Sequence, residues 1–321
     1  MAKKKTEKVV NRLVIIGMGL IGSSLAAAVR ERNIAKEVIG ISRRKSTLEI
    51  ALNNGIVDRC AGDLVEVASE LTAGDIVVIG VPTLSVPEVL KQCVELLSPE
   101  VTITDVASVK ESVVIAAQEL FGEVPSQLVP GHPIAGSEKS GVTAANVELF
   151  IDHRVILTPV ESTSEDHLKR TSALWQNVGA MVSTMTVQEH DHILAATSHL
   201  PHFLAYSLVD TLAAKGDNHE IFRYAAGGFR DFTRIAASDP VMWRDVCIAN
   251  GEALVDLIEQ YQHELNSIAQ AIRTADADEL LRLFLDRQID GSGTLECSYI
   301  DTDTQRQVRA LDQFRNVSFL Q

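Results

Sequence analysis

The feature that most constrains the fold is a pattern of three glycines directly after a short apolar run. Leu13–Ile16 predicts a buried strand, and an alanine-rich stretch that ends near Val29 predicts the following helix. Between them, Gly17 permits a tight turn, Gly19 lets the backbone approach a pyrophosphate, and Gly22 lets the helix pack closely on the strand. The free amides at the start of such a helix face the phosphates. This strand, turn and helix therefore predict a dinucleotide-binding unit.

The cofactor preference of such a unit is set at the end of its second strand, here Val38–Ile41. An NAD enzyme usually carries an acid there for the ribose 2′-hydroxyl. This chain has Ser42, Arg43 and Arg44 instead, and their hydroxyl and guanidinium groups suit a 2′-phosphate in charge and geometry. We predict NADP as the cofactor, with NAD as the alternative if the arginines face water. The predicted cofactor-binding residues are Gly17, Gly19, Leu20, Ile21, Gly22, Ser42, Arg43, Arg44, Thr47, Val81 and Pro82.

Length and composition limit the class of protein. At 321 residues, with 46% hydrophobic and 22% charged residues, the chain is long enough for two folded domains. A net charge of −14 argues against a nucleic-acid partner. No apolar run approaches the roughly 18 residues of a membrane span, and the N-terminus lacks the apolar segment of a secretion signal. We predict a cytoplasmic protein whose scattered cysteines are buried thiols: Cys60, Cys93, Cys247 and Cys297.

Apolar runs and amphipathic stretches alternate from Val9 to about Met185, which is typical of a parallel sheet with helices on both faces. Further strands are predicted at 75–81, 102–106, 127–130, 154–158 and 181–184, and helices at 87–97 and 110–120. Beyond Met185 helical patterns replace strands, beginning with a capping box of Thr186 and Glu189. The predicted fold is α/β, a Rossmann-type doubly wound parallel sheet followed by an all-α dimerisation domain.

The predicted domains are 9–185 for the cofactor, 186–297 for the helices and 298–321 for a polar, loosely attached tail. The long apolar faces of the helical segment favour a homodimer formed through that domain.

Chemistry is expected where the parallel strands end, because ligands of open α/β sheets bind at the carboxyl ends of the strands. The candidate segments are 81–83, 105–110 and 131–138, together with 197–202 and 227–234 from the helical part. His132 stands between Gly131 and Pro133, in a predicted loop after a strand. A histidine there could take a proton from an alcohol as its hydride leaves. The alternative is a structural histidine bonded to the backbone.

Several of these segments together resemble the prephenate/arogenate dehydrogenase family of tyrosine biosynthesis. They are 17–22 (GMGLIG), 105–110 (DVASVK), 132–141 (HPIAGSEKSG), 198–202 (SHLPH), 231–234 (DFTR) and 238–243 (SDPVMW). The resemblance runs in order over roughly residues 10–290. The histidine segment and the arginine segment are its distinctive parts, whereas the glycine pattern is common to many families.

The resemblance implies roles for individual residues. It implies that Ser108 and His132 act on the substrate hydroxyl and that Arg234 binds a substrate carboxylate. It also implies that His199, Glu138 and Asp231 shape the substrate pocket. The alternative for Arg234 is an ion pair with Asp231 or Asp239, and both interpretations can hold together because a pairing acid would also orient the guanidinium. Tyrosine, which resembles the product, is expected as an inhibitor. The choice between prephenate and arogenate stays open, with a slight preference for arogenate.

No metal site is predicted. Four histidines lie close together in the sequence, at 190, 192, 199 and 202, but no cysteine or paired acid completes a recognisable ligand set. Trp243 and the pair Phe229 and Phe232 are expected to pack in the core or in a dimer interface.

Two other functions are weighed against the dehydrogenase. One is a 3-hydroxyacid or imine reductase, which would usually need a catalytic lysine in the helical part. Lys215 is the only lysine after Lys169, and its place in a predicted helix-ending turn weakens this alternative. The other is a protein that senses a nucleotide without catalysis, which the fold alone does not exclude.

Overall fold

The computed structural model describes residues 9–137, 139–216, 218–285, 298–301 and 306–309. By backbone contacts the chain separates into two units, residues 1–255 and 256–321, and each is described by itself. The domain limits predicted from the sequence stay predictions. Among the described residues no helix is both long and apolar enough to cross a membrane.

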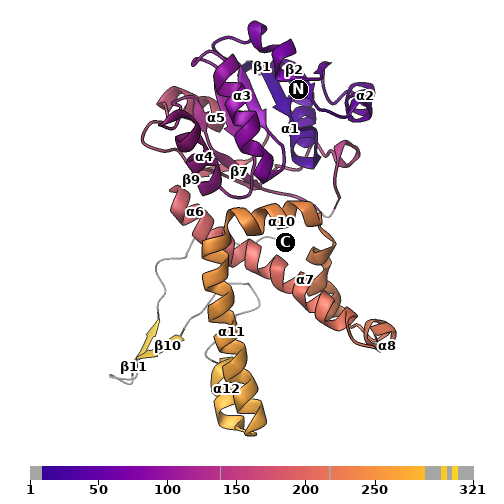
Figure 1. Ribbon diagram of the computed structural model, residues 1–321, viewed down its shortest axis with the longest axis vertical. Helices are drawn as coiled ribbons and strands as arrows, with labels where there is room; N and C mark the ends of the chain where they lie inside the picture. Colours follow the sequence, from indigo (N-terminus) through magenta and orange to yellow (C-terminus); the bar gives the residue numbers. More distant parts are fainter. Residues whose placement is uncertain (1–8, 138, 217, 286–297, 302–305, 310–321) are drawn as a thin grey trace, which may run out of the picture. The chain divides into compact units, whose positions relative to one another are not determined.

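The first unit is built on a six-stranded parallel sheet, which lies in the upper part of Figure 1. In spatial order its strands are β3 (Arg59–Ala61), β2 (Ala35–Ile41), β1 (Val10–Ile16), β4 (Ile76–Ile79), β5 (Thr102–Asp105) and β6 (Leu128–Val129). The helices that connect or cover them are α1 (Leu20–Glu31), α2 (Lys45–Asn53), α3 (Val86–Leu96), α4 (Glu111–Phe121) and α5 (Glu165–Asn177). The chain order reverses between β1 and β4, as in a doubly wound fold.

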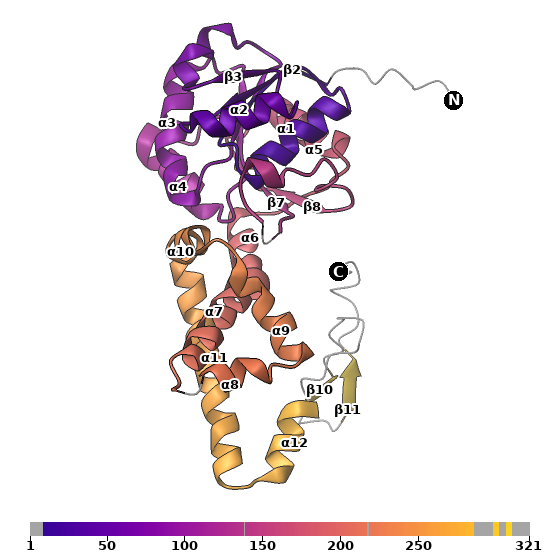
Figure 2. The same cartoon turned by 90° about the vertical axis from the view of Figure 1, so that its right-hand side faces the viewer.

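Strand β1 explains why helices cover both faces of this sheet. Leu13 and Ile15 belong to one buried cluster, which also holds Trp175 of α5. Val14 and Ile16 belong to a second cluster, which holds Leu90 of α3. Because successive side chains of a strand point to opposite faces, an unbroken apolar run needs cover on both. Figure 2 shows α3 and α4 on one side of the sheet and α1 and α5 on the other. The predicted doubly wound sheet is confirmed.

A second, three-stranded sheet corrects part of the prediction. The strands β7 (Gly131–Ile134), β8 (Arg154–Leu157) and β9 (Met181–Thr184) form it in that order, and β7 runs antiparallel to β8. The strands predicted at 154–158 and 181–184 therefore exist but do not extend the parallel sheet. Only Pro130 separates β6 from β7, which leaves no room for the crossover that a parallel neighbour would need.

His132 consequently lies on a strand, and its prediction in a loop was wrong. It is on β7, at the edge of the small sheet, where the following Pro133 is tolerated because an edge strand need not donate every hydrogen bond.

The rest of the first unit is helical. It comprises α6 (Val187–Leu194), a π-helical turn (Ala195–His199), α7 (Leu200–Ala213), α8 (Asn218–Arg223), α9 (Gly227–Thr233), a 3₁₀ turn (Arg234–Ala237) and α10 (Pro240–Ala249). The predicted capping box of Thr186 and Glu189 at the start of α6 is confirmed.

Helix α11 (Gly251–Arg273) begins in the first unit and continues into the second, which also contains α12 (Ala277–Leu285) and a hairpin of β10 (Ser298–Asp301) and β11 (Arg306–Arg309). Of the cysteines predicted to be buried, Cys93 is buried, Cys60 and Cys247 are half-buried, and all three are free thiols. Cys297 lies outside the described residues.

Candidate active site

The glycine turn between β1 and α1 has the geometry of a pyrophosphate cradle. Gly17 has a φ of +104°, and a Cβ there would lie 2.4 Å from the carbonyl oxygen of Gly80. A Cβ on Gly22 would lie 2.3 Å from the carbonyl oxygen of Gly17. Gly19 is the N-cap of α1, has no side-chain cap, and faces open space. The first amides of α1 therefore lack a protein cap, and the space beside them accommodates an anion.

The turn after β2 presents positive charge beside this cradle. Ser42 is half-buried and its hydroxyl accepts the backbone N–H of Arg44 at 3.2 Å. Arg43 and Arg44 are exposed at the start of α2, and no acidic residue occurs from position 42 to 48. The side chains at this turn can therefore bind a phosphate through guanidinium groups.

The ring of His132 begins a buried chain of hydrogen bonds. Its Nδ1 lies 2.9 Å from Nε2 of His190, and Nδ1 of His190 lies 2.6 Å from Oδ1 of Asp191. The two carboxylate oxygens of Asp191 also accept the backbone N–H groups of Lys110, at 2.9 Å, and Glu111, at 2.8 Å. Within the described part of the chain, Nε2 of His132 has no hydrogen-bond partner. That nitrogen is available to a ligand.

Burial sets the charge states along this chain. It lowers the pKa of His132 well below its ordinary value, and positive charge on His190 or Lys110 lowers it further. Burial also lowers the pKa of His190, although the hydrogen bond with Asp191 acts in the opposite direction. For Asp191 burial acts to raise the pKa, but the bonds from His190 and the two amides outweigh it and hold the pKa below its ordinary value. Near neutral pH His132 is uncharged and can accept a proton.

A buried lysine and aspartate fix the backbone next to His132. Lys110 and Asp105 are completely buried and form an ion pair. The Lys110 ammonium donates to the carbonyl oxygen of Gly131 at 2.7 Å, and Asp105 accepts the N–H of Gly131 at 3.2 Å. Sequence reasoning placed both residues at a strand end but gave Lys110 no role, because its burial could not be seen. It also considered His190 only as a metal ligand and did not consider Asp191.

A second group of buried donors comes from the helical part of the first unit. Nδ2 of Asn250 donates to the carbonyl oxygen of Asp191 at 2.9 Å and lies 3.1 Å from Nδ1 of His199. Since an amide nitrogen only donates, Nδ1 of His199 accepts and its Nε2 carries the hydrogen. This Nε2 and Nε1 of Trp243 are buried without a hydrogen-bond partner in the described residues. Two unpaired donors of this kind suit an acceptor on a bound molecule.

Arg234 is exposed and lies near this donor group. Burial lowers the pKa of His202, and the charge of Arg234 contributes to the decrease. The ring of His202 stacks on Trp243 with centroids 3.7 Å apart. Among the described residues Arg234 forms no ion pair, and the carboxylate of Asp239 instead caps α10 by accepting the N–H of Val241 at 2.8 Å. The ion-pair alternative for Arg234 is therefore not observed.

Comparison with known proteins decides the family. Residues 25–184 match the family model of the prephenate dehydrogenase nucleotide-binding domain, and residues 186–286 match that of the prephenate dehydrogenase dimerization domain. This chain belongs to the prephenate dehydrogenase family. Its relatives include the cyclohexadienyl dehydrogenase of Zymomonas mobilis, which is 36% identical over 87% of this chain and 94% of that protein. The prephenate dehydrogenase of Bacillus subtilis is 35% identical over 85% of this chain and 73% of that protein.

Solved structures of the family have the same fold. The prephenate dehydrogenase of Aquifex aeolicus, in complex with hydroxyphenyl propionate and NAD⁺, has a TM-score of 0.78 and 34% identity. The match covers 87% of this chain and 96% of that one. The arogenate dehydrogenase of Synechocystis has a TM-score of 0.69 and 30% identity over 85% of this chain and 95% of that one. The resemblance to this family seen in the sequence is confirmed.

The remaining predicted site residues are placed as follows. Ser108 is half-buried in the loop between β5 and α4, and Val81 and Pro82 follow β4 after Gly80, so all three lie at carboxyl ends of strands. Thr47 is half-buried on α2, and Asp231 is exposed on α9. Glu138 lies outside the described residues. The roles of these residues stay predictions.

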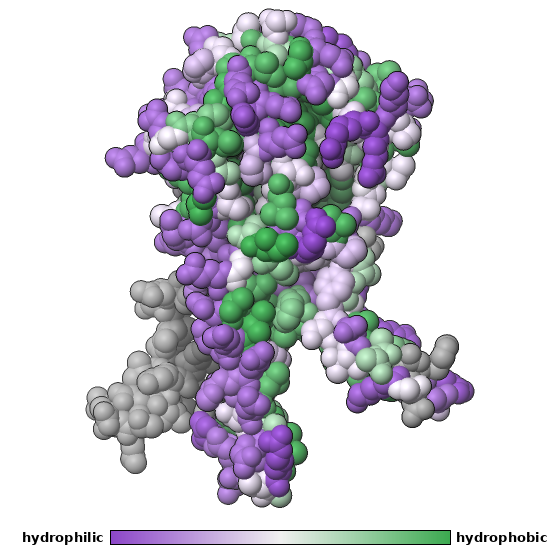
Figure 3. Space-filling view, viewed as in Figure 1, coloured by the Kyte–Doolittle hydropathy of each residue, from purple (hydrophilic) through white to green (hydrophobic). Residues whose placement is uncertain are grey.

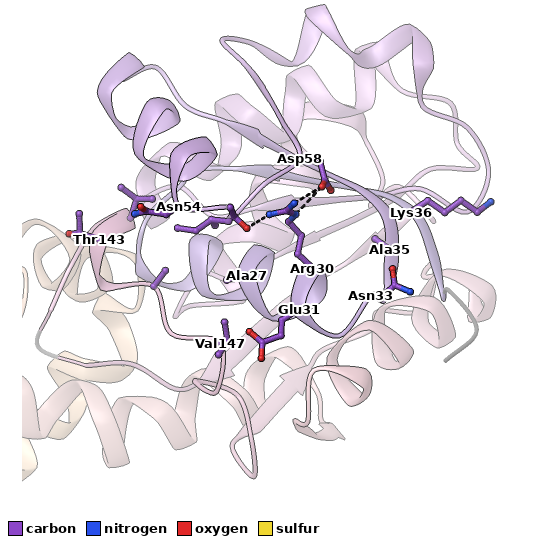
Figure 4. Close-up of a pocket in the computed structure, with 14 residues that line it drawn as sticks. Ala27, Arg30, Glu31, Asn33, Ala35, Lys36, Asn54, Asp58, Thr143 and Val147 are labelled. Carbon is purple, nitrogen blue, oxygen red and sulfur yellow. Dashed lines mark hydrogen bonds and ion pairs between the residues drawn. The ribbon is translucent and has the colours of Figure 1, made fainter. Parts of the chain in front are cut away.

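A pocket of about 600 Å³ lies elsewhere on the first unit (Figure 4). It is lined by residues at the end of α1 and the start of β2, which is the amino end of that strand. Its main cation, Arg30, already pairs with Asp58 at 2.9 Å, and Lys36 donates to Asn11 at 2.7 Å. Because family ligands are expected at carboxyl ends of strands, this pocket is not the candidate active site.

The buried histidines predict a loss of stability in acid. Burial lowers the pKa of His199 to about 4, whereas an unfolded histidine titrates near 6.5. Between these values the unfolded chain binds more protons than the folded one, so the free energy of unfolding falls with pH by about 3 kcal/mol for this residue. Urea denaturation at pH 7 and pH 4.5 measures the decrease. His199→Gln should remove the share of this decrease that belongs to His199, because other buried histidines contribute the rest. His192→Asn, on an exposed residue, should leave the decrease unchanged, and equal pH dependence in all three proteins would contradict the prediction.

Proposed function

We propose that this protein catalyses the NADP-dependent oxidative decarboxylation of a cyclohexadienyl acid, arogenate or prephenate, in tyrosine biosynthesis. The observation that carries the proposal is the buried His132, whose Nε2 lacks a partner among the described residues. Family membership supplies the reaction class, NAD(P)-dependent oxidative decarboxylation. The cofactor, the substrate and the residue roles are the proposed parts.

The reaction needs a base at the ring hydroxyl. Loss of the ring carboxylate needs little acid catalysis. His132 accepts the hydroxyl proton at Nε2 while Ser108 donates a hydrogen bond that orients the hydroxyl. A bound nicotinamide would accept the hydride that leaves the carbinol carbon. The ring carboxylate then leaves as carbon dioxide, its bonding electrons make the ring aromatic, and His132 returns the proton to the phenolate oxygen. Aromatisation drives the loss of carbon dioxide.

NADP is the proposed cofactor because the turn after β2 carries two exposed guanidinium groups and no acid. Residues Gly17–Gly22 would bind the pyrophosphate, since a side chain is sterically excluded at Gly17 and at Gly22. Arg43 and Arg44, with Ser42 and Thr47, would bind the 2′-phosphate.

The two carboxylates of the substrate need fixed donors. Arg234 supplies a guanidinium with no partner acid among the described residues, and the buried N–H groups of His199 and Trp243 face no protein acceptor there. Asp231 and Glu138 are the proposed acids near the amino group of arogenate.

A homodimer formed through the helical residues is also proposed. Apolar side chains lie at the surface over α10 (Figure 3), where Val241 is 48% and Ile248 is 62% exposed. The match of residues 186–286 to a dimerization domain supports this assignment. We further propose that tyrosine inhibits by competing for the substrate pocket, because its phenol ring resembles that of the product.

The test is a set of four absorbance assays that follow reduced cofactor, with arogenate or prephenate and with NADP or NAD. Activity with NADP and either substrate is the expected result. A preference for NAD would reject the role of Arg43 and Arg44. No activity in any of the four assays, with NADPH binding intact, would reject the dehydrogenase function and favour a protein that only senses the nucleotide. Reduction of a 3-hydroxyacid precursor or an imine would instead favour the reductase alternative.

Arg234→Gln is expected to raise the KM for the substrate by about 10- to 100-fold and to lower kcat by less than threefold. Glutamine keeps a donor but loses the charge and the bidentate geometry that hold a carboxylate in the ground state. Steady-state kinetics measure both constants. Arg230→Gln, four residues earlier on α9, is the matched control. An unchanged KM in Arg234→Gln would exclude this arginine from the site.

The double variant Arg43→Ala/Arg44→Ala is expected to raise the KM for NADP by about tenfold or more while changing the KM for NAD by less than threefold. Only NADP carries the 2′-phosphate that these side chains would bind. Parallel kinetics with the two cofactors measure the difference. Equal effects on both would place the arginines outside the ribose site.

A further inference from the structure

We propose that His190 and Asp191 are positioning residues that hold His132 as its Nδ1–H tautomer, so that the bare Nε2 faces the substrate hydroxyl. The catalytic part of this inference rests on the proposed function. The tautomer itself does not, because it follows from the direction of each hydrogen bond.

Hydrogen bonds to the backbone fix the position of the Asp191 carboxylate. Its two carboxylate oxygens accept the N–H groups of Lys110 and Glu111 at the start of α4. This position also places its negative charge at the positive end of an eleven-residue helix. An ionised carboxylate only accepts hydrogen bonds. Asp191 is therefore an oriented acceptor, and any further bond to it must come from a donor.

The direction of the next two bonds follows. Nδ1 of His190, 2.6 Å from Oδ1 of Asp191, must carry a hydrogen. A neutral imidazole carries one hydrogen, so Nε2 of His190 is an acceptor. The facing nitrogen, Nδ1 of His132 at 2.9 Å, must then donate, which leaves Nε2 of His132 without a hydrogen. The reverse order would require Asp191 to donate.

The surroundings of the two rings support this arrangement. His132 and His190 contact edge to face, with centroids 5.1 Å apart, and His190 is completely buried. The other charged or titratable groups nearby are Lys110, paired with Asp105, and His199. When Nε2 of His132 takes a proton, the imidazolium keeps its bond to His190, and the bond of His190 to Asp191 stabilises the positive charge. No ring has to turn during the reaction.

Two substitutions at position 190 separate this role from a structural one. Asparagine places an amide near the position of Nδ1, so His190→Asn can still reach Asp191 but not His132. Glutamine places an amide near the position of Nε2, so His190→Gln can still accept from His132. His192→Asn on the exposed face of the same helix is the control.

The experiment uses the full chain labelled with ¹⁵N-histidine. Long-range ¹H–¹⁵N spectra distinguish protonated from bare ring nitrogens, and His132→Asn assigns the His132 signals. In the unsubstituted protein at pH 7.5 we expect His132 protonated at Nδ1 and bare at Nε2. In His190→Asn the Nε2–H tautomer should appear and kcat should fall by about 10- to 100-fold, with substrate KM within threefold. His190→Gln should recover most of kcat, and His192→Asn should match the parent.

A proton on Nε2 of His132 in the unsubstituted protein would overturn the proposal, as would an unchanged tautomer and kcat in His190→Asn. The spectra need no substrate. If the protein oxidises neither cyclohexadienyl acid, the tautomer of His132 is still measured. Failure of the proposed role of His190 and Asp191 and failure of the proposed function therefore give different results.

Discussion

Replacing His132 with asparagine is expected to lower kcat by about 10²- to 10⁴-fold. Asparagine approximates the polarity of the ring near Nδ1 and can still donate to His190, but it has no basic nitrogen at the position of Nε2. The affinity for NADP should change by less than about twofold, because His132 lies on β7 and not in the glycine turn between β1 and α1. Steady-state kinetics measure kcat, and titration of cofactor fluorescence measures the affinity.

The control is His153→Asn, which alters an exposed histidine just before β8 and should leave both quantities unchanged. Turnover of the His132 variant within tenfold of the parent would mean that another group accepts the proton. A parallel loss of cofactor affinity would instead indicate that the substitution disturbs the fold around β7.

Replacing Lys110 with methionine is expected to lower the free energy of unfolding by about 3–5 kcal/mol. Methionine has nearly the length of lysine and fills the buried space, but it leaves the buried carboxylate of Asp105 without its cation. It also removes the donor to the Gly131 carbonyl. Urea denaturation monitored by circular dichroism measures the change, which is a large part of the stability of an ordinary domain.

Lys169→Met is the matched control, because Lys169 pairs with Glu165 on the surface of α5 at 2.9 Å. Removal of such an exposed pair should leave the free energy of unfolding nearly unchanged. If the two variants had equal stability, the buried pair would contribute no more than a solvated one, and the account of how Gly131 is fixed would be wrong.

The first strand, turn and helix could be predicted because their information is local. Apolar residues 13–16 need cover on both faces, and Gly17 and Gly22 stand where any side chain would meet backbone. The capping box at Thr186 is local in the same sense, since its two members are three residues apart. Each of these features depends on neighbours that the sequence itself puts in contact.

The small sheet could not be predicted in the same way. Strand β8 has the apolar run of a parallel-sheet strand, and only its pairing with β7 and β9 shows that it belongs to a separate sheet. That pairing begins at Pro130, directly after the two-residue strand β6, where the Pro130 carbonyl oxygen accepts the N–H of Thr158 at 2.9 Å. Periodicity identifies a strand but does not identify its partner.

The candidate active site likewise has residues that the sequence predicts and residues that only the tertiary structure brings together. The sequence by itself determined a dinucleotide-binding turn, a family resemblance, and His132 and Arg234 as candidate groups, because residue type and short spacing carry that information. Only the tertiary structure brought His190 and Asp191 to His132, across 58 positions of the chain, and buried Lys110 against Asp105. Hydrogen-bond direction and burial depend on which distant residues become neighbours, and that is decided when the strands and helices pack together.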